Sequence, residues 1–197
     1  LYQQKQGLLH LRQPGEEKRE ACQELAYIAL DRLQDVQSAL GWYGEGFKEE
    51  PEHKTCRLEL HQLALEHGFA SALIMLYAEA REHLSEASTI CDLSIYIAQV
   101  QMEHMQDWEA AEREYVYARS IDEDRLAIYE GLDRVYSTLE RWPELENIIS
   151  NEIRLLEFDG DEHLTAVESL YWRIADLYEY RLGQAEKAVE VFQHINQ

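Results

Sequence analysis

A pattern of large and small residues recurs five times along this chain of 197 residues. Each copy has a bulky or apolar residue, two variable positions, a central residue that is usually alanine, three variable positions and another large residue, as in Trp108-x-x-Ala111-x-x-x-Tyr115. Spacings of three and four place these side chains on one helix face, where a small residue lets a neighbouring helix approach closely. Each copy therefore predicts the start of the second helix of a pair. The central residues, at intervals of 33, 39, 34 and 43, are Ala39, Ala72, Ala111, Leu145 and Ala188.

A first helix is predicted ahead of each copy, because a small or apolar residue lies at a nearly constant distance upstream. Four of these residues lie thirteen positions before the central residue, and Leu60 lies twelve before Ala72. The five upstream residues are Ala26, Leu60, Ala98, Leu132 and Ala175. Turns of two residues join the helices and predict antiparallel pairs. These turns are Gln34-Asp35, His67-Gly68, Gln106-Asp107, Glu140-Arg141 and Gly183-Gln184.

The last copy resembles the tetratricopeptide repeat (TPR) family, whose signature is W-x2-L-G-x2-Y followed by A-x3-F and a proline. The matching residues are Tyr171-x2-Ile174-Ala175-x2-Tyr178 and then Ala188-x3-Phe192. Pro51, twelve residues after Ala39, occupies the place of the family's inter-repeat proline. The resemblance covers roughly residues 16–197. It implies an all-α fold, an α-solenoid of antiparallel helix-turn-helix repeats wound as a right-handed superhelix.

Residues 16–197 are expected to form one solenoid domain of about five TPR-like helical hairpins. Residues 1–15 are interpreted as the tail of a preceding repeat helix, stopped by Pro14-Gly15. The longer intervals predict extended helices or loops near residues 82–89 and 158–163, where Asp159-Gly160-Asp161 is typical of a turn. Because neither end carries the polar cap that a solenoid needs, we interpret the chain as a segment of a larger array.

The charge of the chain narrows the classes of partner. With 18 basic and 39 acidic residues the formal charge is −21, which disfavours nucleic acid and anionic membrane surfaces. Residues 81–197 hold 10 basic and 26 acidic residues, so a basic partner should prefer this half. Three cysteines in helical sequence do not indicate a disulfide framework, which favours a reducing compartment. We therefore expect a cytoplasmic protein, and an upstream targeting segment is an open alternative.

In TPR arrays the first helices line a concave groove, and the resemblance implies which positions face it. Their polar and aromatic members are the candidate partner-binding residues Tyr27, Arg57, His61, Gln99, Tyr129, Asp133, Tyr136, Trp172, Asp176 and Glu179. The remaining groove positions are Gln23, Leu30, Ala64, Ile95 and Met102. An acidic and aromatic groove favours a peptide with Arg or Lys beside an apolar anchor. We expect the main ligand surface in the C-terminal half. The alternative is that some of these aromatic residues pack between helices as core.

Catalysis and cofactors are not predicted. There is no phosphate-binding glycine loop and no nucleophile elbow in the sequence. His53, Cys56 and His61 could form a metal-ligating set, but no second cluster lies at a recognised spacing, so we expect no metal. Cys22 and Cys56 occupy helix-packing positions and are expected to be buried, inert thiols.

The sequence supports three functional hypotheses. The first is a non-catalytic scaffold or adaptor that binds a peptide or protein surface in its acidic, aromatic groove. The second is a regulatory or sensory segment of a larger enzyme, such as a protease or kinase, whose catalytic domain lies outside this chain. The third is self-association through uncapped array ends. The first and second differ only in the sequence that flanks the repeats.

Overall fold

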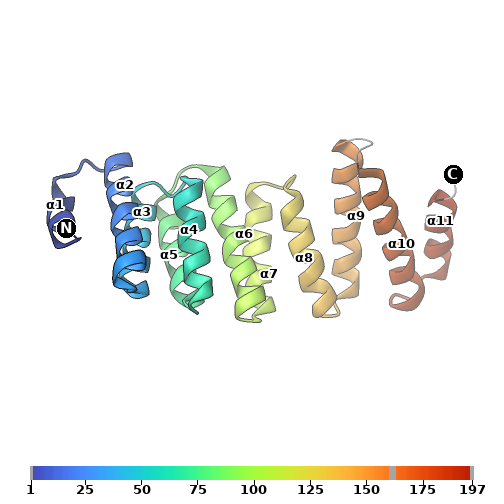
Figure 1. The fold of residues 1–197 in the computed structure, drawn as a ribbon. Helices are drawn as coiled ribbons and strands as arrows, with labels where there is room; N and C mark the ends of the chain where they lie inside the picture. Colours follow the sequence, from blue (N-terminus) through green and yellow to red (C-terminus); the bar gives the residue numbers. More distant parts are fainter. Residues whose placement is uncertain (1, 160–162, 196–197) are drawn as a thin grey trace. The chain divides into compact units, whose positions relative to one another are not determined.

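The computed structural model describes residues 2–159 and 163–195 and divides into two compact units between Leu93 and Ser94. The first unit consists of short helices in chain order (Figure 1). Helix α2 continues into the single π-helical turn η2, and α1 into the 3-10 turn η1. The elements of this unit are α1 (Tyr2–Leu8), η1 (Leu9–Leu11), α2 (Glu16–Ile28), η2 (Ala29–Leu33), α3 (Val36–Glu49), α4 (Lys54–Glu66) and α5 (Ala70–His83).

Helix α6 (Ala87–His104) contains the boundary, and the second unit holds the remaining helices. These are α7 (Trp108–Ile121), α8 (Leu126–Thr138), α9 (Trp142–Asp159), α10 (Leu164–Tyr180) and α11 (Ala185–Ile195). Within the described residues the chain is all-α, as predicted, with eleven α-helices in sequential antiparallel pairs and no β-strand. The expected long elements are α6 and α9, with 18 residues each. Apart from Asp159, which ends α9, the predicted Asp159-Gly160-Asp161 turn lies outside the described residues.

Each of the five predicted turns joins the two helices of a pair. One residue in every turn has a positive φ, which reverses the chain at the end of the first helix. These residues are Gln34, Gly68, Gln106, Glu140 and Gly183, with φ between 52° and 77°. In two turns the next residue caps the second helix: the carboxylates of Asp35 and Asp107 accept the N–H groups of Ser38 and Ala110, at 3.0 and 2.9 Å. Short local signals thus fix where these helices begin.

The central residues and their upstream partners lie where the helices of a pair cross, and all but one of these ten residues are buried as predicted. The buried ones are Ala26, Ala39, Leu60, Ala98, Ala111, Leu132, Leu145, Ala175 and Ala188. Larger apolar residues one or two turns away complete the core, among them Phe47 and Tyr77 in the first unit and Ile128 and Ile149 in the second. Among the described residues, no helix is both long enough and apolar enough to span a bilayer.

Helix α5 departs from the predicted register by one residue. Phe69 is the residue before the helix, not its first member, so α5 begins at Ala70. Ala72 is exposed, and Leu73 and Tyr77 are buried in its place. The assignment of Ala72 as the crossing residue was therefore wrong. Leu73 lies thirteen residues after Leu60, which restores the spacing of the other four pairs.

Replacing Ala111 with leucine should lower the free energy of unfolding by about 1 to 3 kcal/mol, because the added atoms overpack a closed crossing. Ala72→Leu is the matched control: the same change at an exposed helix position should alter stability by less than about 0.5 kcal/mol. Urea unfolding followed by circular dichroism measures both. Equal destabilisation by the two substitutions would contradict the corrected register.

Candidate protein-binding surface

The structure places the three candidate residues of the first unit in different environments. Tyr27 is 59% exposed on α2. Arg57 is buried on α4, with its guanidinium 3.4 Å from the carboxylate of Asp92. His61 is half-buried, and its ring nitrogen Nδ1 lies 3.3 Å from the Tyr77 hydroxyl. Of the three, Tyr27 alone offers an open contact surface.

Polar side chains link the first helices of successive pairs in this unit. Arg19 of α2 is buried, pairs with Glu50 at 2.5 Å and donates to the side chain of Gln23. The Gln23 amide in turn donates to Glu59 of α4 at 2.9 Å. The Arg57–Asp92 pair links α4 to the start of α6. Sequence analysis singled out Gln23 and Arg57 as groove residues but missed the links, because each joins residues about 35 positions apart.

In the second unit, three of the candidate partner-binding residues are buried, as are the groove positions Ile95 and Met102. Tyr129, Asp133 and Tyr136 are 3%, 7% and 6% exposed. The Tyr129 hydroxyl donates to the backbone carbonyl of Glu123 at 2.7 Å. The expected open aromatic surface on α8 is therefore absent, and the alternative of aromatic packing between helices holds there. Gln99 on α6 is half-buried.

The Tyr136 side chain is held by its own neighbours. Its hydroxyl donates to Glu112 at 3.0 Å, and Arg141 lies over its ring at 4.9 Å from the centroid. Burial, reinforced by the Glu112 contact, raises the pKa of Tyr136 to about 12. The phenol is thus a structural hydrogen-bond donor and stays protonated at neutral pH.

A charged cluster joins α8, α9 and α10, with the Asp133 and Glu152 carboxylates buried and Arg173 partly exposed. Arg173 of α10 makes two hydrogen bonds, of 2.7 and 2.8 Å, to the carboxylate of Asp133, which also accepts from Ser137. Glu152 of α9 is 9% exposed, and among the described residues its Oε2 atom has no hydrogen-bond partner. Desolvation and the nearby Asp133 raise the pKa of Glu152 to about 7, while Arg173 opposes the rise. Neither Arg173 nor Glu152 was identified from the sequence, because their partners lie on other helices.

A second polar link crosses this unit. Arg134 of α8 pairs with Glu103 of α6 at 2.8 Å. Together with the Arg173–Asp133 pair, it connects three successive first helices, α6, α8 and α10. The first helices of the second unit are therefore joined by charged groups.

The remaining candidates, Trp172, Asp176 and Glu179, lie along one exposed stripe of α10. Their spacing of four and three puts them on a single helix face. Trp172 is 45% exposed and packs against Phe192 of α11, with the ring centroids 5.4 Å apart. Of the seven candidate residues in the second unit, the structure thus leaves these three exposed and places them together.

A pocket of about 440 Å³ adjoins this stripe. Leu145 and Ile149 of α9 and Leu177 of α10 give it apolar walls. Its remaining lining residues are polar or aromatic: Arg173, Asp176, Tyr180 and Arg181. Tyr180 is 70% exposed and was not predicted. We call the stripe and this pocket the α10 surface. It combines a pocket of mixed apolar and polar lining, two aromatic side chains and two exposed carboxylates.

The candidate metal ligands have structural roles in the fold. The ring of His53 caps α4 by accepting the N–H of Cys56 at 3.3 Å, and the Cys56 thiol lies 3.8 Å from the carbonyl of Tyr43. Among the described residues, no group of three or more His, Cys, Asp or Glu side chains is arranged to hold a metal ion. Burial raises the pKa of Cys22 to about 11 and that of Cys56 to about 12, so both thiols are unreactive at neutral pH.

Comparison with known proteins relates the helical pairs to solved structures. YrrB, a TPR protein with an unusual peptide-binding site, matches 89% of this chain and 83% of its own, with a TM-score of 0.53 and 12% identity. MamA from Desulfovibrio magneticus RS-1, residues 41 to the end, matches 93% of this chain and 95% of its own, with a TM-score of 0.56 and 12% identity. The chain has the tetratricopeptide-repeat fold.

A TPR sensor also occurs among the structural neighbours. It belongs to a signal transduction ATPase with numerous domains from Pyrococcus horikoshii. The match covers 90% of this chain and 28% of that protein, with a TM-score of 0.50 and 17% identity. No protein-family model matches the chain, and no curated protein matches it.

Proposed function

We propose that this chain is a protein-binding TPR segment whose contact surface in the second unit is the α10 surface. The observation that carries the proposal is the exposed stripe of Trp172, Asp176 and Glu179 beside a pocket in which three apolar side chains are exposed to a ligand together with polar ones. An aromatic ring next to a cavity provides contact area at low entropic cost, and flanking carboxylates select the partner's charge.

The preferred ligand is a peptide with one apolar anchor and neighbouring Arg or Lys residues. The anchor fits the cavity lined by Leu145, Ile149 and Leu177. Asp133 is buried and already pairs with Arg173, so Asp176 and Glu179 are the carboxylates open to a ligand cation. The net charge of −16 in residues 81–197 adds long-range attraction for such a peptide.

The fold supports the same class of function. TPR structures resemble this chain over most of its length, and one of them, YrrB, has a peptide-binding site. These likenesses support the protein-binding class, and the α10 surface carries the choice of position and ligand chemistry.

Removing Trp172, or both exposed carboxylates, should weaken peptide binding at least about tenfold, since each change costs roughly 1.4 kcal/mol or more. The probe is a panel of fluorescent peptides with one Leu or Met between Arg and Lys residues, measured by anisotropy. Trp172→Ala should lose contact area at any salt concentration. Asp176→Asn with Glu179→Gln should reduce the salt dependence of binding, because screening acts over about 8 Å at physiological ionic strength.

The matched control is Glu109→Gln with Glu140→Gln, which removes two exposed carboxylates of the same unit outside the α10 surface. This variant should bind the panel about as well as the unmodified chain. If the control weakens binding as much as the α10 variants do, the interaction depends on net charge alone. That result would overturn the proposed site.

A regulatory role within a larger protein is the second candidate. The ATPase of P. horikoshii, with its TPR sensor, is the observation that favours it. Such a role would use the same peptide-binding surface, with the ligand as the sensed signal. Sequencing the full reading frame tests it, because a catalytic domain must then flank the repeats.

A further inference from the structure

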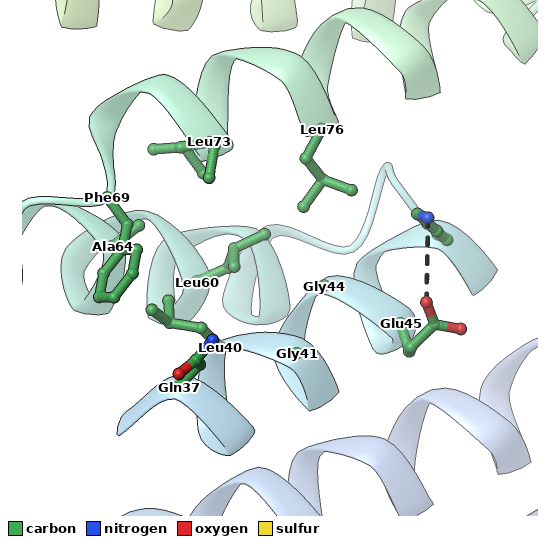
Figure 2. Close-up of a pocket in the computed structure, with 12 residues that line it drawn as sticks. Gln37, Leu40, Gly41, Gly44, Glu45, Leu60, Ala64, Phe69, Leu73 and Leu76 are labelled. Carbon is green, nitrogen blue, oxygen red and sulfur yellow. Dashed lines mark ion pairs between the residues drawn. The ribbon is translucent and has the colours of Figure 1, made fainter. Parts of the chain in front are cut away.

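An apolar groove lies between α3 and α5 in the first unit (Figure 2). Its main pocket has a volume of about 440 Å³. Leu40 comes from α3, Phe69 and Leu76 from the α5 side, and Leu60 of α4 lies between the two helices as the floor. Both walls run in the same chain direction, because α3 and α5 are the second helices of consecutive pairs. The groove thus has the form of a trough between two parallel helices.

Glycine keeps the α3 wall of the groove open. A Cβ atom added at Gly41 would have no atom within 4 Å, so the space beside this residue is empty. At Gly44 an added Cβ would lie 3.4 Å from Leu76 Cδ2, in ordinary contact. On the α5 side of the groove, the exposed Ala72 contributes only a methyl group to the lining. Gly41 and Gly44 lie inside helix α3, where a glycine lowers stability by about 0.5 to 1 kcal/mol relative to alanine.

A second, smaller pocket of about 270 Å³ continues the groove toward the ends of the two helices. Pro51, Ala80 and Leu84 line it, and Lys48 lines both pockets. Along α5 the centres of the two lining sets lie about eight residues apart, or about 12 Å at the helical rise. This spacing corresponds to two turns of a helix.

Charged groups bridge the groove between the two pockets. The Lys48 ammonium lies 3.8 Å from Glu45 on its own helix and 3.6 Å from Glu79 on α5. Both carboxylates are more than half exposed. Two carboxylates facing one ammonium leave one negative charge without compensation. A cation of a ligand placed between the pockets would neutralise this remaining negative charge.

We propose that the α3–α5 groove docks an amphipathic helix of a partner protein, with two aliphatic side chains two turns apart and an Arg or Lys between them. The aliphatic residues at positions i and i+7 occupy the two pockets, as in other helix-in-groove complexes. The basic residue between them contacts Glu45 and Glu79. This site uses the second helices of the repeats, whereas the α10 surface belongs to a first helix, so the two sites are independent.

The test uses Gly41→Leu, which places an apolar side chain at the wall of the main pocket; its Cβ atom would meet no atom within 4 Å. The probe is a cross-linked helical peptide of about four turns. It carries Leu at i and i+7 and Arg at i+3 and i+4, and its comparison peptide carries Glu at the two Arg positions. Anisotropy with the full chain should show binding of the Arg peptide that Gly41→Leu weakens at least about tenfold.

Gly7→Leu is the matched control, because Gly7 lies in helix α1 and an added Cβ there also meets no atom within 4 Å. It should bind the Arg peptide like the unmodified chain, as should the α10 variants. Equal binding of the Glu peptide, or undiminished binding by Gly41→Leu, would overturn the proposal. So would self-association that Gly41→Leu abolishes while neither peptide binds, since the groove would then hold a second copy of the chain.

Discussion

Replacing Gly131 with alanine is expected to lower the free energy of unfolding by about 2 kcal/mol, although alanine is the better helix former. A Cβ at this position of α8 would lie 2.1 Å from Cζ of Tyr115, with two further ring atoms within 2.6 Å. The Tyr115 ring is 1% exposed and closely surrounded, so it has little room to move. Overpacking of this kind costs 1 to 3 kcal/mol and occasionally more, which exceeds the gain of about 1 kcal/mol in helix propensity.

Gly41→Ala is the opposite case, because the added methyl group in α3 meets no atom within 4 Å. It should raise the free energy of unfolding by about 0.5 to 1 kcal/mol. Urea unfolding of both variants gives the comparison. A double-mutant cycle of Gly131→Ala with Tyr115→Leu should show a coupling of about 1 kcal/mol or more between the two sites. Additive effects would show that Tyr115 is not the clashing group.

Stability should fall as the pH rises from about 4.5 to about 7, and Glu152 should account for much of the fall. The ordinary pKa of 4.5 is raised to about 7 in the fold, so the folded chain holds a proton that the unfolded chain releases in this window. The stabilisation is complete below pH 4.5 and is lost above pH 7. The shift corresponds to at most about 3 kcal/mol.

Glu152→Gln keeps the neutral form at every pH, so its free energy of unfolding should change less between pH 5 and 8 than that of the unmodified chain. The difference should approach about 2 to 3 kcal/mol. Glu140→Gln, an exposed carboxylate in the same unit, controls for the loss of one charge. Parallel pH profiles for the unmodified chain and Glu152→Gln would show that Glu152 titrates near its ordinary pKa.

The helix starts could be predicted because their signals are local. The carboxylate of Asp35 or Asp107 accepts the backbone N–H of the residue three positions further along and so caps its helix. No tertiary contact is needed for this cap. At α5 the same reasoning failed, because the large side chain of Phe69 resembled the first residue of the other copies. The spacing of thirteen from Leu60 to Leu73 was the signal that would have corrected it.

The candidate site was only partly predictable, because exposure depends on groups that are distant in the sequence. Tyr136 occupies a groove position by spacing, yet its hydroxyl is bound by Glu112, 24 residues away. The carboxylate of Asp133 accepts a hydrogen bond from Arg173, which lies 40 residues further along the sequence. Trp172 and Asp176 remain exposed on α10. Periodicity identifies the face of a helix, but only the neighbouring helices decide which side chains on it stay open.

The polar links between successive first helices also determine how the repeats communicate. In a linear array, cooperativity arises from the interfaces between neighbouring repeats. Part of each such interface consists here of charge pairs, Arg57 with Asp92 in one unit and Arg134 with Glu103 in the other. Dissolved ions screen the exposed Arg134–Glu103 pair but act little on the buried Arg57, and the apolar crossings within each helical pair are unaffected. In the second unit, ionic strength should therefore tune how strongly the unfolding of the α6–α7 hairpin is coupled to that of the α8–α9 hairpin, separately from the stability of each hairpin.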